Sequence, residues 1–577
     1  MNTGEQESSK DQVSHKSLRL WPGIVIVVLQ WLIRFIIPLL SSSEKALMIG
    51  VFGGILGGLA IVVWWAFFSR ARISDRWNAI LLMIISLFAA SRFLDKSIAT
   101  ANMGMMFTIF SIPVMSLAFT VWAVVSRKFT DRIRRVTMIL TIVLAAGIWT
   151  LLRTNGMTSH LHHDLAWRWA KTEEDRFLSR TENEPMSLPA AVKTAGNWDG
   201  FRGQNRDGII HGVRIKTDWK VSPPAELWRR PIGPGCSSFA IGDGLLYTQE
   251  QRGANEAVAC YDLATGKPVW IHTDKARFWD SHAGAGPRST PTLSNGRIVT
   301  FGATGILNVL QASDGKLEWS RNAATDTGEK ELGWGFTSSP VVFGDVVIVA
   351  ANGKLASYDL NTGEPRWFGP DGGTGYSSPH LLTIGGVTQV LLMSSTGVSS
   401  LNPADGKLLW RYQWQLGDPI LQPAQILDGE ILLGGDMSQT MRRISVAHQT
   451  DGWKVSERWT TSAITPYFND FVINNGHVYG FDGLSLACVG IEDGKRKWRA
   501  GRYGGQMLLL ADQNLILVLS EKGDLVLVSA TPDKFTELAR LPVIKGKTWN
   551  HPVLAGNILL VRNGQEMAAF RLMLADN

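Results

Sequence analysis

The chain has 577 residues, of which 45% are hydrophobic and 19% are charged, with 57 Lys and Arg against 50 Asp and Glu. This apolar content excludes a disordered or fibrous chain, and three cysteines exclude a disulfide scaffold. The length predicts more than one domain. The abundance of glycine (58) and tryptophan (23) favours a turn-rich β protein.

The basic charge is confined to the N-terminal part of the chain. Residues 1–153 carry a formal net charge of +9, whereas the remainder carries −2. The excess therefore lies in the most apolar part of the sequence, where basic residues flank membrane spans. We expect the lipid bilayer, and no nucleic acid, as the partner of this region.

Five apolar runs occur at about 21–40, 46–68, 77–94, 103–126 and 136–152. A bilayer core needs about 20 apolar residues as helix, so all five are long enough to span it. A cleaved signal peptide is the alternative for the first run, but four more runs follow and no small-x-small cleavage site is evident. The sequence predicts a tail at 1–20 and a five-span domain at 21–153.

Basic residues in the flanks predict the orientation of these spans. They gather in the tail and in the second and fourth loops: Lys10, Lys16, Arg19, Arg70, Arg72, Arg76, Arg127, Lys128, Arg132, Arg134 and Arg135. These parts are therefore expected in the cytoplasm, and an odd number of spans places everything after about 153 outside. For a bacterium, this predicts a multi-pass inner-membrane protein whose C-terminal part lies in the periplasm.

Two features of the spans have more than one interpretation. Gly50, Gly54 and Gly58 form a flat face in the second span, which predicts close packing inside the bundle or a homodimer interface. Arg34 lies within the first span, where an unpaired charge is costly. We expect Arg34 to be paired or to reach the headgroups, and a position near a lipid quinone is the alternative.

Residues 154–197 are polar and are expected to form a juxtamembrane linker. Three histidines cluster in it: His160, His162 and His163. Such a cluster can bind a transition metal, but one short stretch without Cys cannot complete a coordination sphere, so a solvated linker is favoured and no metal site is predicted. Residues 164–178 are expected to form a short helix at the membrane surface, with Trp167 and Trp169 at the interface.

From about residue 226 the chain repeats itself. A glycine turn followed by tryptophan recurs with anchors 39–49 residues apart. The anchors are Trp228, Trp270, Trp319, Trp367, Trp410, Trp459, Trp498 and, with leucine in place of tryptophan, Leu538. We expect these tryptophans to pack between repeats rather than to contact a ligand.

Each repeat contains short β-branched runs separated by Gly-Asp or Gly-Asn turns. Their periodicity of two excludes a helical solenoid, and four short strands per 40–50 residues are typical of a β-propeller blade. Eight anchors predict an all-β, eight-bladed propeller over 198–577. Residues 226–231 have no inner strands ahead of them and are expected to complete the eighth blade, which closes the ring.

These turn-plus-tryptophan repeats resemble the pyrroloquinoline quinone (PQQ) propeller repeat over about 198–572. That repeat occurs in quinoprotein dehydrogenases and in the non-catalytic propeller lipoprotein of outer-membrane barrel assembly. The opening of the domain resembles that of bacterial PQQ-like repeat proteins of unassigned activity: Trp198-Asp199-Gly200-Phe201-Arg202-Gly203-Gln204-Asn205-Arg206-Asp207-Gly208. Five spans before a propeller also resemble membrane-bound quinoprotein glucose dehydrogenase, which reduces ubiquinone. Repeat similarity predicts fold more strongly than function.

The loops that enter the innermost strands should line one face of the propeller, which is the default place for a ligand site. The resemblance implies PQQ with Ca²⁺ there, although no cofactor is certain. Asp470 would be the base, Arg288 would polarise the quinone, and Trp549 or Trp334 would stack on it. The further candidate binding residues are Ser338, His380, Gln422, Asn469, Asn550 and His551. The alternative is that the Ser and Asn side chains only cap strand ends.

Three observations weaken the quinoprotein interpretation. The aligned loops supply one carboxylate, which cannot serve as both base and Ca²⁺ ligand. Cys236, Cys260 and Cys488 are isolated, so the vicinal pair of many quinoprotein alcohol dehydrogenases is missing, although Cys236 and Cys260 are candidates for a disulfide. The propeller also lacks long insertions between blades.

The sequence therefore favours a membrane-anchored binding or scaffolding propeller with a periplasmic protein partner. The alternative is a PQQ-dependent sugar or alcohol dehydrogenase that passes electrons to membrane quinone, and a ligand sensor is a third hypothesis. The sequence contains no CxxC, HExxH, P-loop, GxSxG or CxxCH motif that would favour another chemistry.

Overall fold

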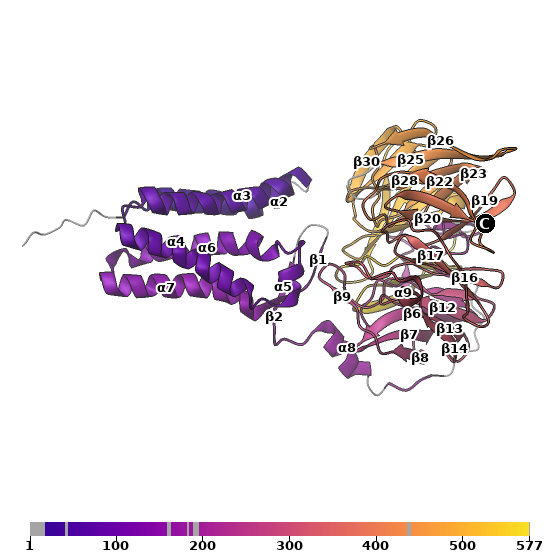
Figure 1. Ribbon diagram of the computed structural model, residues 1–577, viewed down its shortest axis with the longest axis horizontal. Helices are drawn as coiled ribbons and strands as arrows, with labels where there is room; N and C mark the ends of the chain where they lie inside the picture. Colours follow the sequence, from indigo (N-terminus) through magenta and orange to yellow (C-terminus); the bar gives the residue numbers. More distant parts are fainter. Residues whose placement is uncertain are drawn as a thin grey trace, which may run out of the picture. The chain divides into compact units, whose positions relative to one another are not determined.

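The computed structural model describes residues 18–40, 44–158, 163–181, 184–187, 196–435 and 440–575. The chain divides into two compact units, residues 1–170 and 171–577 (Figure 1). The first unit is helical, and the second is a β-propeller.

Long apolar helices make up the first unit. In chain order they are α1 (Trp21–Trp31) with η1 (Leu32–Ile36) and α2 (Ile37–Leu40), α3 (Glu44–Val63) with η2 (Trp64–Phe68), α4 (Ile73–Ser91), α5 (Lys96–Thr100), α6 (Met106–Val125) with η3 (Ser126–Lys128), and α7 (Asp131–Gly147) with η4 (Ile148–Leu151). Within the described residues, five of these segments are long and apolar enough to cross a membrane, namely 21–40, 46–68, 73–91, 106–128 and 131–151. The five predicted segments are confirmed, and the third begins four residues earlier than expected.

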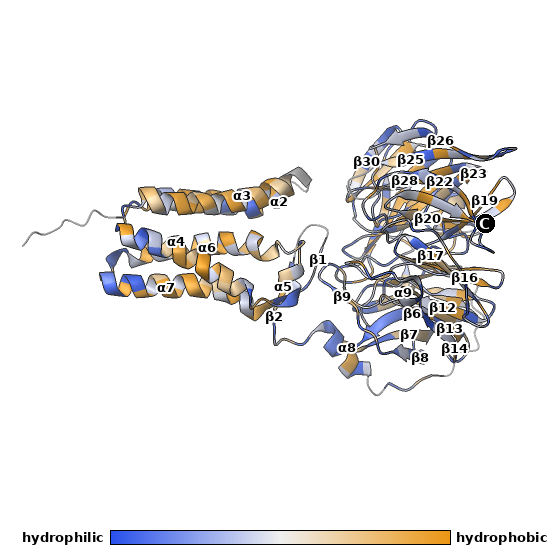
Figure 2. Cartoon of the chain, viewed as in Figure 1, coloured by the Kyte–Doolittle hydropathy of each residue, from blue (hydrophilic) through white to orange (hydrophobic). Residues whose placement is uncertain are grey.

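The exposed surface of these helices is apolar (Figure 2). Phe88 is 61% exposed and Leu144 is 69% exposed, while Trp65 and Phe119 are buried in the interior, edge to face. This is the reverse of a water-soluble bundle, which turns its apolar stripe inward.

The loop before α4 and the loop before α7 lie at the same end of the helical unit. Arg72 pairs with Asp131 at 2.9 Å, and Arg135 pairs with Asp75 at 2.9 Å. The two basic loops identified in the sequence therefore form one basic end.

The glycine face of α3 packs inside the helical unit. A Cβ atom at Gly58 would lie 2.1 Å from Ile112 of α6, and one at Gly50 would lie 2.8 Å from Pro38 of α2. Gly54 faces both Arg34 and Pro113. This face is covered by helices of the same chain, so it is not free to form the predicted homodimer interface.

Arg34 is buried in the π-helical turn η1, with its guanidinium 5.0 Å from the ring centre of Phe35 and 4.6 Å from that of Phe110. Within the described part of the chain it forms no ion pair. Aromatic faces, rather than the expected opposite charge, surround it.

The predicted surface helix at 164–178 is wrong. Residues 163–167 form β2 (His163–Trp167), which pairs with β1 (Leu152–Met157), because Leu165 and its neighbours lie opposite 152–154. The helix begins later, as α8 (Glu173–Thr181). Thr172 and Asp175 fix its start, since each backbone N–H donates to the other residue's side chain. Within the cluster of histidines, His163 contacts Asn102, while His160 and His162 lie outside the described residues.

The second unit contains eight antiparallel sheets arranged as propeller blades, which confirms the predicted number. The strands of blades 1 to 4, from inner to outer, are β5 (Ala240–Gly242), β6 (Leu245–Arg252), β7 (Asn255–Asp262), β8 (Pro268–Asp274); β11 (Thr292–Ser294), β12 (Arg297–Phe301), β13 (Ile306–Gln311), β14 (Leu317–Asn322); β15 (Val341–Phe343), β16 (Val346–Ala351), β17 (Lys354–Asp359), β18 (Pro365–Phe368); and β19 (His380–Ile384), β20 (Val387–Ser394), β21 (Gly397–Leu401), β22 (Leu408–Gln413).

Those of blades 5 to 8 are β23 (Ala424–Leu427), β24 (Glu430–Leu433), β25 (Met441–Gln449), β26 (Gly452–Thr461); β27 (Phe471–Asn474), β28 (His477–Asp482), β29 (Ser485–Gly490), β30 (Arg496–Arg502); β31 (Gln506–Leu510), β32 (Leu515–Leu519), β33 (Asp524–Ser529), β34 (Glu537–Pro542); and β35 (Val553–Ala555), β36 (Ile558–Arg562), β37 (Glu566–Arg571), β4 (Ala225–Pro231). Short elements between them are β9 (Trp279–Asp280), β10 (Gly284–Ala285), α9 (Ala323–Thr327) and η5 (Ala511–Gln513).

The ring closes as predicted, because β4 from the start of the domain pairs with β37 from its end. A second closure was not predicted. β3 (Ile209–Ile210) adds in parallel to β31 as a fifth, innermost strand of blade 7. The start of the domain therefore pairs with the last two blades, through β3 at the inner edge of blade 7 and through β4 at the outer edge of blade 8.

The repeated tryptophans join neighbouring blades, as predicted. Their indole N–H groups donate to a backbone carbonyl of the next blade in six pairs: Trp228 to Leu263, Trp270 to Ala312, Trp319 to Leu360, Trp367 to Pro403, Trp459 to Ile491 and Trp498 to Thr531. The turn glycine makes room for the ring. A Cβ at Gly315, whose φ is 73°, would lie 2.4 Å from Trp270. Trp410 differs, since it donates to the Gln389 side chain of its own blade.

Candidate functional site

The opening segment of the domain, residues 198–210, crosses the centre of the propeller. Trp198 bridges to Ile241 of blade 1, and the Leu293 N–H of blade 2 donates to Asp199. Further along, Arg206 reaches blade 3, Arg202 reaches blade 6, and β3 pairs with blade 7. One short segment therefore contacts five blades around the central channel that propellers enclose.

Arg202 and Arg206 both adopt left-handed backbone conformations, with φ of 61° and 57°. Residues with a Cβ rarely occupy this region, and they do so where the surroundings enforce it. Gly203 and Gly208, also at positive φ, allow the tight turns between and after them. This geometry sends both guanidinium groups toward the beginnings of the inner strands.

Asp470, the predicted base, lies at the start of blade 6 and is buried and paired. Its Oδ1 is 3.4 Å from Arg202 Nη1, and its Oδ2 is 2.7 Å from His551 Nε2. Burial would raise the pKa of this carboxyl, but Arg202 and His551 hold the pKa below its ordinary value. Both oxygens of Asp470 are thus engaged by the chain itself, which leaves it poorly placed to accept a substrate proton.

His380, at the start of blade 4, is buried beside this pair. Burial, together with the charges of Arg206 and Arg202, lowers the pKa of His380 to about 3. His380 is therefore neutral at physiological pH. Arg202, Arg206, His380, Asp470 and His551 together form what we call the central layer.

The predicted amide and hydroxyl residues bind the backbone around the central layer. Gln422 donates to Pro379 at 3.1 Å, Asn469 donates to Gly505 at 2.6 Å, and Asn550 donates to Ser237 at 2.7 Å. The Ser338 hydroxyl accepts from the Ala350 N–H at 2.9 Å. These contacts agree with the capping interpretation, since each joins an inner strand to its neighbour or to its own hairpin.

Arg288, the other predicted catalytic residue, does not join the central layer. Its guanidinium pairs with Asp280 of β9 and donates to the Gly284 carbonyl of the same short hairpin. Its Nη1 lies 3.9 Å from Cys236 Sγ. Arg288 and His282 hold the pKa of Asp280 at about 2, although burial opposes them. This second ion pair was missed because Asp280 lies in an insertion that does not align with the repeats.

Half-buried rings from the loops before the inner strands form a continuous circuit, which we call the aromatic collar. It consists of the rings of His282, Trp334, Tyr467, Phe468 and Trp549, together with the side chain of Lys547. Ring centres along it are 5.2–6.2 Å apart, and Lys547 closes it, with its Nζ 4.2 Å from the Trp549 ring centre and donating to the His282 carbonyl. Burial lowers the pKa of Lys547. Trp549 donates to Glu521 and contacts Phe468, so the predicted stacking platform already has ring partners.

These residues do not fit PQQ with Ca²⁺. Ca²⁺ needs several oxygen ligands that include carboxylates. Asp470 and Asp280, the carboxylates buried in these loops, are each paired with an arginine, and the described residues contain no group of three acidic, His or Cys side chains placed to hold a metal. A flat cofactor would also have to part collar rings that already contact one another.

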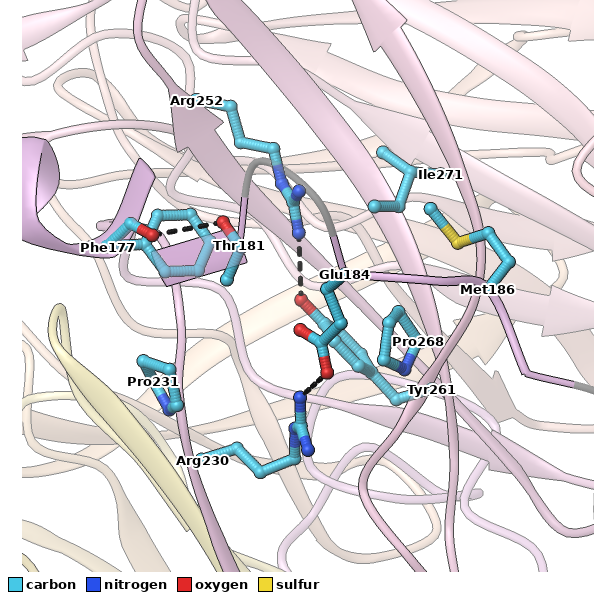
Figure 3. Close-up of a pocket in the computed structure, with 10 residues that line it drawn as sticks. All are labelled: Phe177, Thr181, Glu184, Met186, Arg230, Pro231, Arg252, Tyr261, Pro268 and Ile271. Atoms are coloured by element: carbon cyan, nitrogen blue, oxygen red, sulfur yellow. Dashed lines mark hydrogen bonds and ion pairs between the residues drawn. The ribbon is translucent and has the colours of Figure 1, made fainter. Parts of the chain in front are cut away.

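The segment before the propeller is docked against blades 1 and 8. Figure 3 shows a pocket under it, lined by Phe177 and Thr181 of α8, by Glu184 and by residues of β4, β6 and β7. Phe177 is buried 5.1 Å from the Arg252 guanidinium, and Glu184 pairs with Arg230. Glu174 pairs with Arg277 through both guanidinium nitrogens, at 2.7 and 2.8 Å. The predicted solvated linker is, in this part, an ordered strap.

The three cysteines are unbonded, so the candidate pair Cys236 and Cys260 forms no disulfide in the structure. Cys260 lies in the buried strand β7 beside Trp270, whereas Cys236 precedes β5. Burial raises the pKa of Cys260 and Cys488, which makes both thiols unreactive.

Sequence reasoning missed Arg202, Arg206, Asp280 and Lys547 as members of the site. A signal for the first two was present, since paired arginines flanked by glycines in the opening motif mark constrained turns. No comparable signal marks Asp280 or Lys547, because the repeat pattern does not specify the conformation of the loops that carry them.

Comparison with known proteins agrees with this architecture. Residues 254–420 match the family described as outer membrane protein assembly factor BamB. The BamB of Moranella endobia (strain PCIT) is 24% identical over 323 residues, which cover 54% of this chain and 76% of that protein. The BamB of Burkholderia pseudomallei (strain K96243) is 24% identical over 247 residues, covering 42% of this chain and 58% of that protein.

Among solved structures, BamB from Moraxella catarrhalis aligns at 16% identity with a TM-score of 0.45, covering 61% of this chain and 99% of that one. The repeat pattern, the eight sheets and the family match agree with one another. The second unit of this chain is a PQQ-like β-propeller similar to BamB.

Proposed function

We propose that this protein is a membrane-anchored, extracytoplasmic propeller that binds a protein partner and acts as a scaffold in outer-membrane protein assembly. The observation that carries the proposal is the filling of the propeller centre by residues 198–210. Because this segment crosses the centre and both oxygens of Asp470 are engaged by the chain itself, the outer faces and loops remain for recognition. The process is inferred from the similar proteins, which are outer membrane protein assembly factors.

An inner-membrane anchor is part of this proposal. The apolar exterior of the helical unit and its single basic end support spanning with that end in the cytoplasm.

Topology is tested with single cysteines in a Cys236→Ser background, because Cys260 and Cys488 are buried. Asp451→Cys, at the turn of the β25–β26 hairpin, should react with a membrane-impermeant maleimide in intact spheroplasts. Arg70→Cys, in the loop before α4, is the matched control and should react only after permeabilisation. The reverse pattern would contradict the orientation.

Partner binding is tested by photocrosslinking in intact cells. The β25–β26 hairpin has the longest strands of the propeller and reaches beyond the neighbouring blades (Figure 1). A photoreactive residue at Gln449 of its exposed tip, and another at the exposed Thr362 of blade 3 as the matched position, should identify the face that binds. A component of outer-membrane protein assembly is the expected product. Recovery of no protein from several positions around the ring would contradict the scaffold.

A PQQ-dependent sugar or alcohol dehydrogenase that reduces membrane quinone is the alternative. The paired carboxylates and the continuous collar disfavour it. Titration calorimetry of the purified protein with PQQ and Ca²⁺ separates the two, since the scaffold predicts no binding heat and no dye reduction with sugars or alcohols.

A further inference from the structure

The central layer contains more positive than negative charge. Arg202, Arg206 and Asp470 are 4%, 8% and 3% exposed, and within the described chain Asp470 pairs only with Arg202 and His551. Arg206 has no ion pair there. Burial lowers the pKa of Arg206 to about 9, which still leaves it charged at neutral pH. Two guanidinium cations therefore share one carboxylate in a region shielded from water, where charges are costly unless they are compensated.

The two arginines also have donors to spare. A guanidinium carries five N–H groups. Arg206 uses Nη1 for the Pro340 carbonyl at 2.9 Å and Nη2 for the Ser339 carbonyl at 3.1 Å, and in the described part of the chain its buried Nε has no acceptor. The buried Nε of Arg202 likewise has no acceptor among the described residues.

The neighbouring histidines agree with a missing acceptor. His380 is 95% buried, and no hydrogen-bond partner is present for its Nδ1 in the described structure. The Nδ1 atom of His551, whose Nε2 binds Asp470, is also unpartnered there. A tautomer that presents N–H at these atoms would add donors around the same point.

The side chains of the central layer are only 3–8% exposed. The opening segment crosses the propeller centre and contributes both arginines, and the aromatic collar forms a continuous circuit in the loops before the inner strands. A peptide carboxylate or a large anion would have to displace one of them. A small inorganic ion needs no such opening beyond local motion.

We propose that the central layer binds one small inorganic anion, of which chloride is the probe, between the guanidinium groups of Arg202 and Arg206 and beside His380. The anion supplies the second negative charge that the two arginines lack and accepts their remaining N–H groups. It thereby joins blades 3, 4 and 6 through the opening segment. This inference concerns the stability of the ring and is independent of the proposed partner.

The first test is thermal unfolding of the purified full-length protein in detergent. Chloride is exchanged for gluconate at constant ionic strength, so that screening stays fixed. At about 100 times Kd, a ligand that binds only the folded state multiplies the folding equilibrium constant by about 100, and Tm rises accordingly. Arg206→Gln should abolish this rise. The control Arg540→Gln changes an exposed ion pair on β34 and should keep it.

The second test does not depend on a variant that folds. Crystals of the wild-type protein grown in bromide should show an anomalous peak within hydrogen-bond distance of both guanidinium groups. Water alone at this position, with the same Tm in chloride and gluconate, would overturn the proposal. A bromide peak without a chloride-dependent Tm would indicate binding at crystal concentration only and would overturn it equally.

Discussion

The central layer and the aromatic collar lie next to each other in the propeller but are built on opposite principles. The central layer buries charges and pairs its carboxylate with a group distant in sequence, as Asp470 and Arg202 lie 268 positions apart. The collar uses half-buried rings from loops before the inner strands, and the buried ion pair beside it, Arg288 with Asp280, spans only eight positions. We infer that the central layer holds the blades of the ring together. The collar loops are anchored locally, so their sequence can vary without opening the ring.

Removal of Arg202 should have the largest effect, because it breaks the long-range pair. Arg202→Met leaves Asp470 buried without its guanidinium and cuts the bonds to the Phe471 and Asp207 carbonyls. Breaking a buried pair on one side costs about 3–5 kcal/mol of unfolding free energy. Urea denaturation of the purified protein measures this loss. Arg540→Met, at an exposed pair, is the control and should change the free energy by less than about 1 kcal/mol.

Substitution of Glu256 should have the next largest effect. Glu256 is a buried carboxyl that forms no ion pair with the described residues of the central layer or the collar. Burial raises the pKa of Glu256 to about 7, although the Ala303 N–H and Arg288 oppose it. Because the folded pKa lies above the ordinary value of 4.5, the folded state holds the Glu256 proton more tightly than the unfolded state does. The unfolding free energy is therefore highest below about pH 4.5 and falls as the pH rises to about 7. Glu256→Gln should therefore stabilise the protein above pH 7, by up to about 3 kcal/mol.

The measurement is unfolding free energy against pH from 4 to 9 for wild type and variant. The Gln side chain can still accept the Ala303 N–H, so the two curves should converge near pH 4.5. Parallel curves would show that ionisation of Glu256 does not contribute.

Asp280→Asn tests the local ion pair of the collar region. The substitution leaves Arg288 without its carboxylate but keeps an oxygen for the His282 and Ala283 N–H groups. We expect a loss of about 2 kcal/mol at pH 7, typical of a hydrogen bond to a charged group. Since the pKa of Asp280 is lowered to about 2, this difference should disappear as the pH falls from about 4 to 2. A loss of unfolding free energy larger than that of Arg202→Met would mean that the collar region, and not the central layer, contributes more to stability.

The order of these effects also explains what could be predicted from the sequence. The blades were predictable because each repeat carries its own turn glycine and its own tryptophan, and Trp270 meets Gly315 only 45 positions away. The repeats also align the loops that enter the inner strands. This alignment placed Asp470 and His551 in one candidate site, and the two side chains are in contact. Their partner Arg202 could not be, because its position depends on how one segment crosses the finished ring. Arg288 was misplaced because a short hairpin outside the repeat captures it.

The helical unit shows the same limit. Apolar run length predicted its five long segments, but the residues after them depend on pairing. Residues 163–167 form a strand because 152–157 are available opposite them, and this contact is not encoded in either segment alone.

Coupling between the collar and the central layer should be the smallest effect. Trp549→Leu removes a half-buried ring, and we expect a loss of about 1 kcal/mol, since Phe468 and Lys547 can close over the smaller side chain. The two regions are adjacent in sequence at 468–470 and at 549–551, yet Asp470 pairs with His551 whereas Phe468 contacts Trp549. Gln506 holds this shared backbone in place by donating to the Phe468 carbonyl at 3.0 Å and the Trp549 carbonyl at 3.2 Å. The double variant with Arg202→Met should thus be additive within about 0.5 kcal/mol, and a coupling above 1 kcal/mol would mean that both regions form one structural unit.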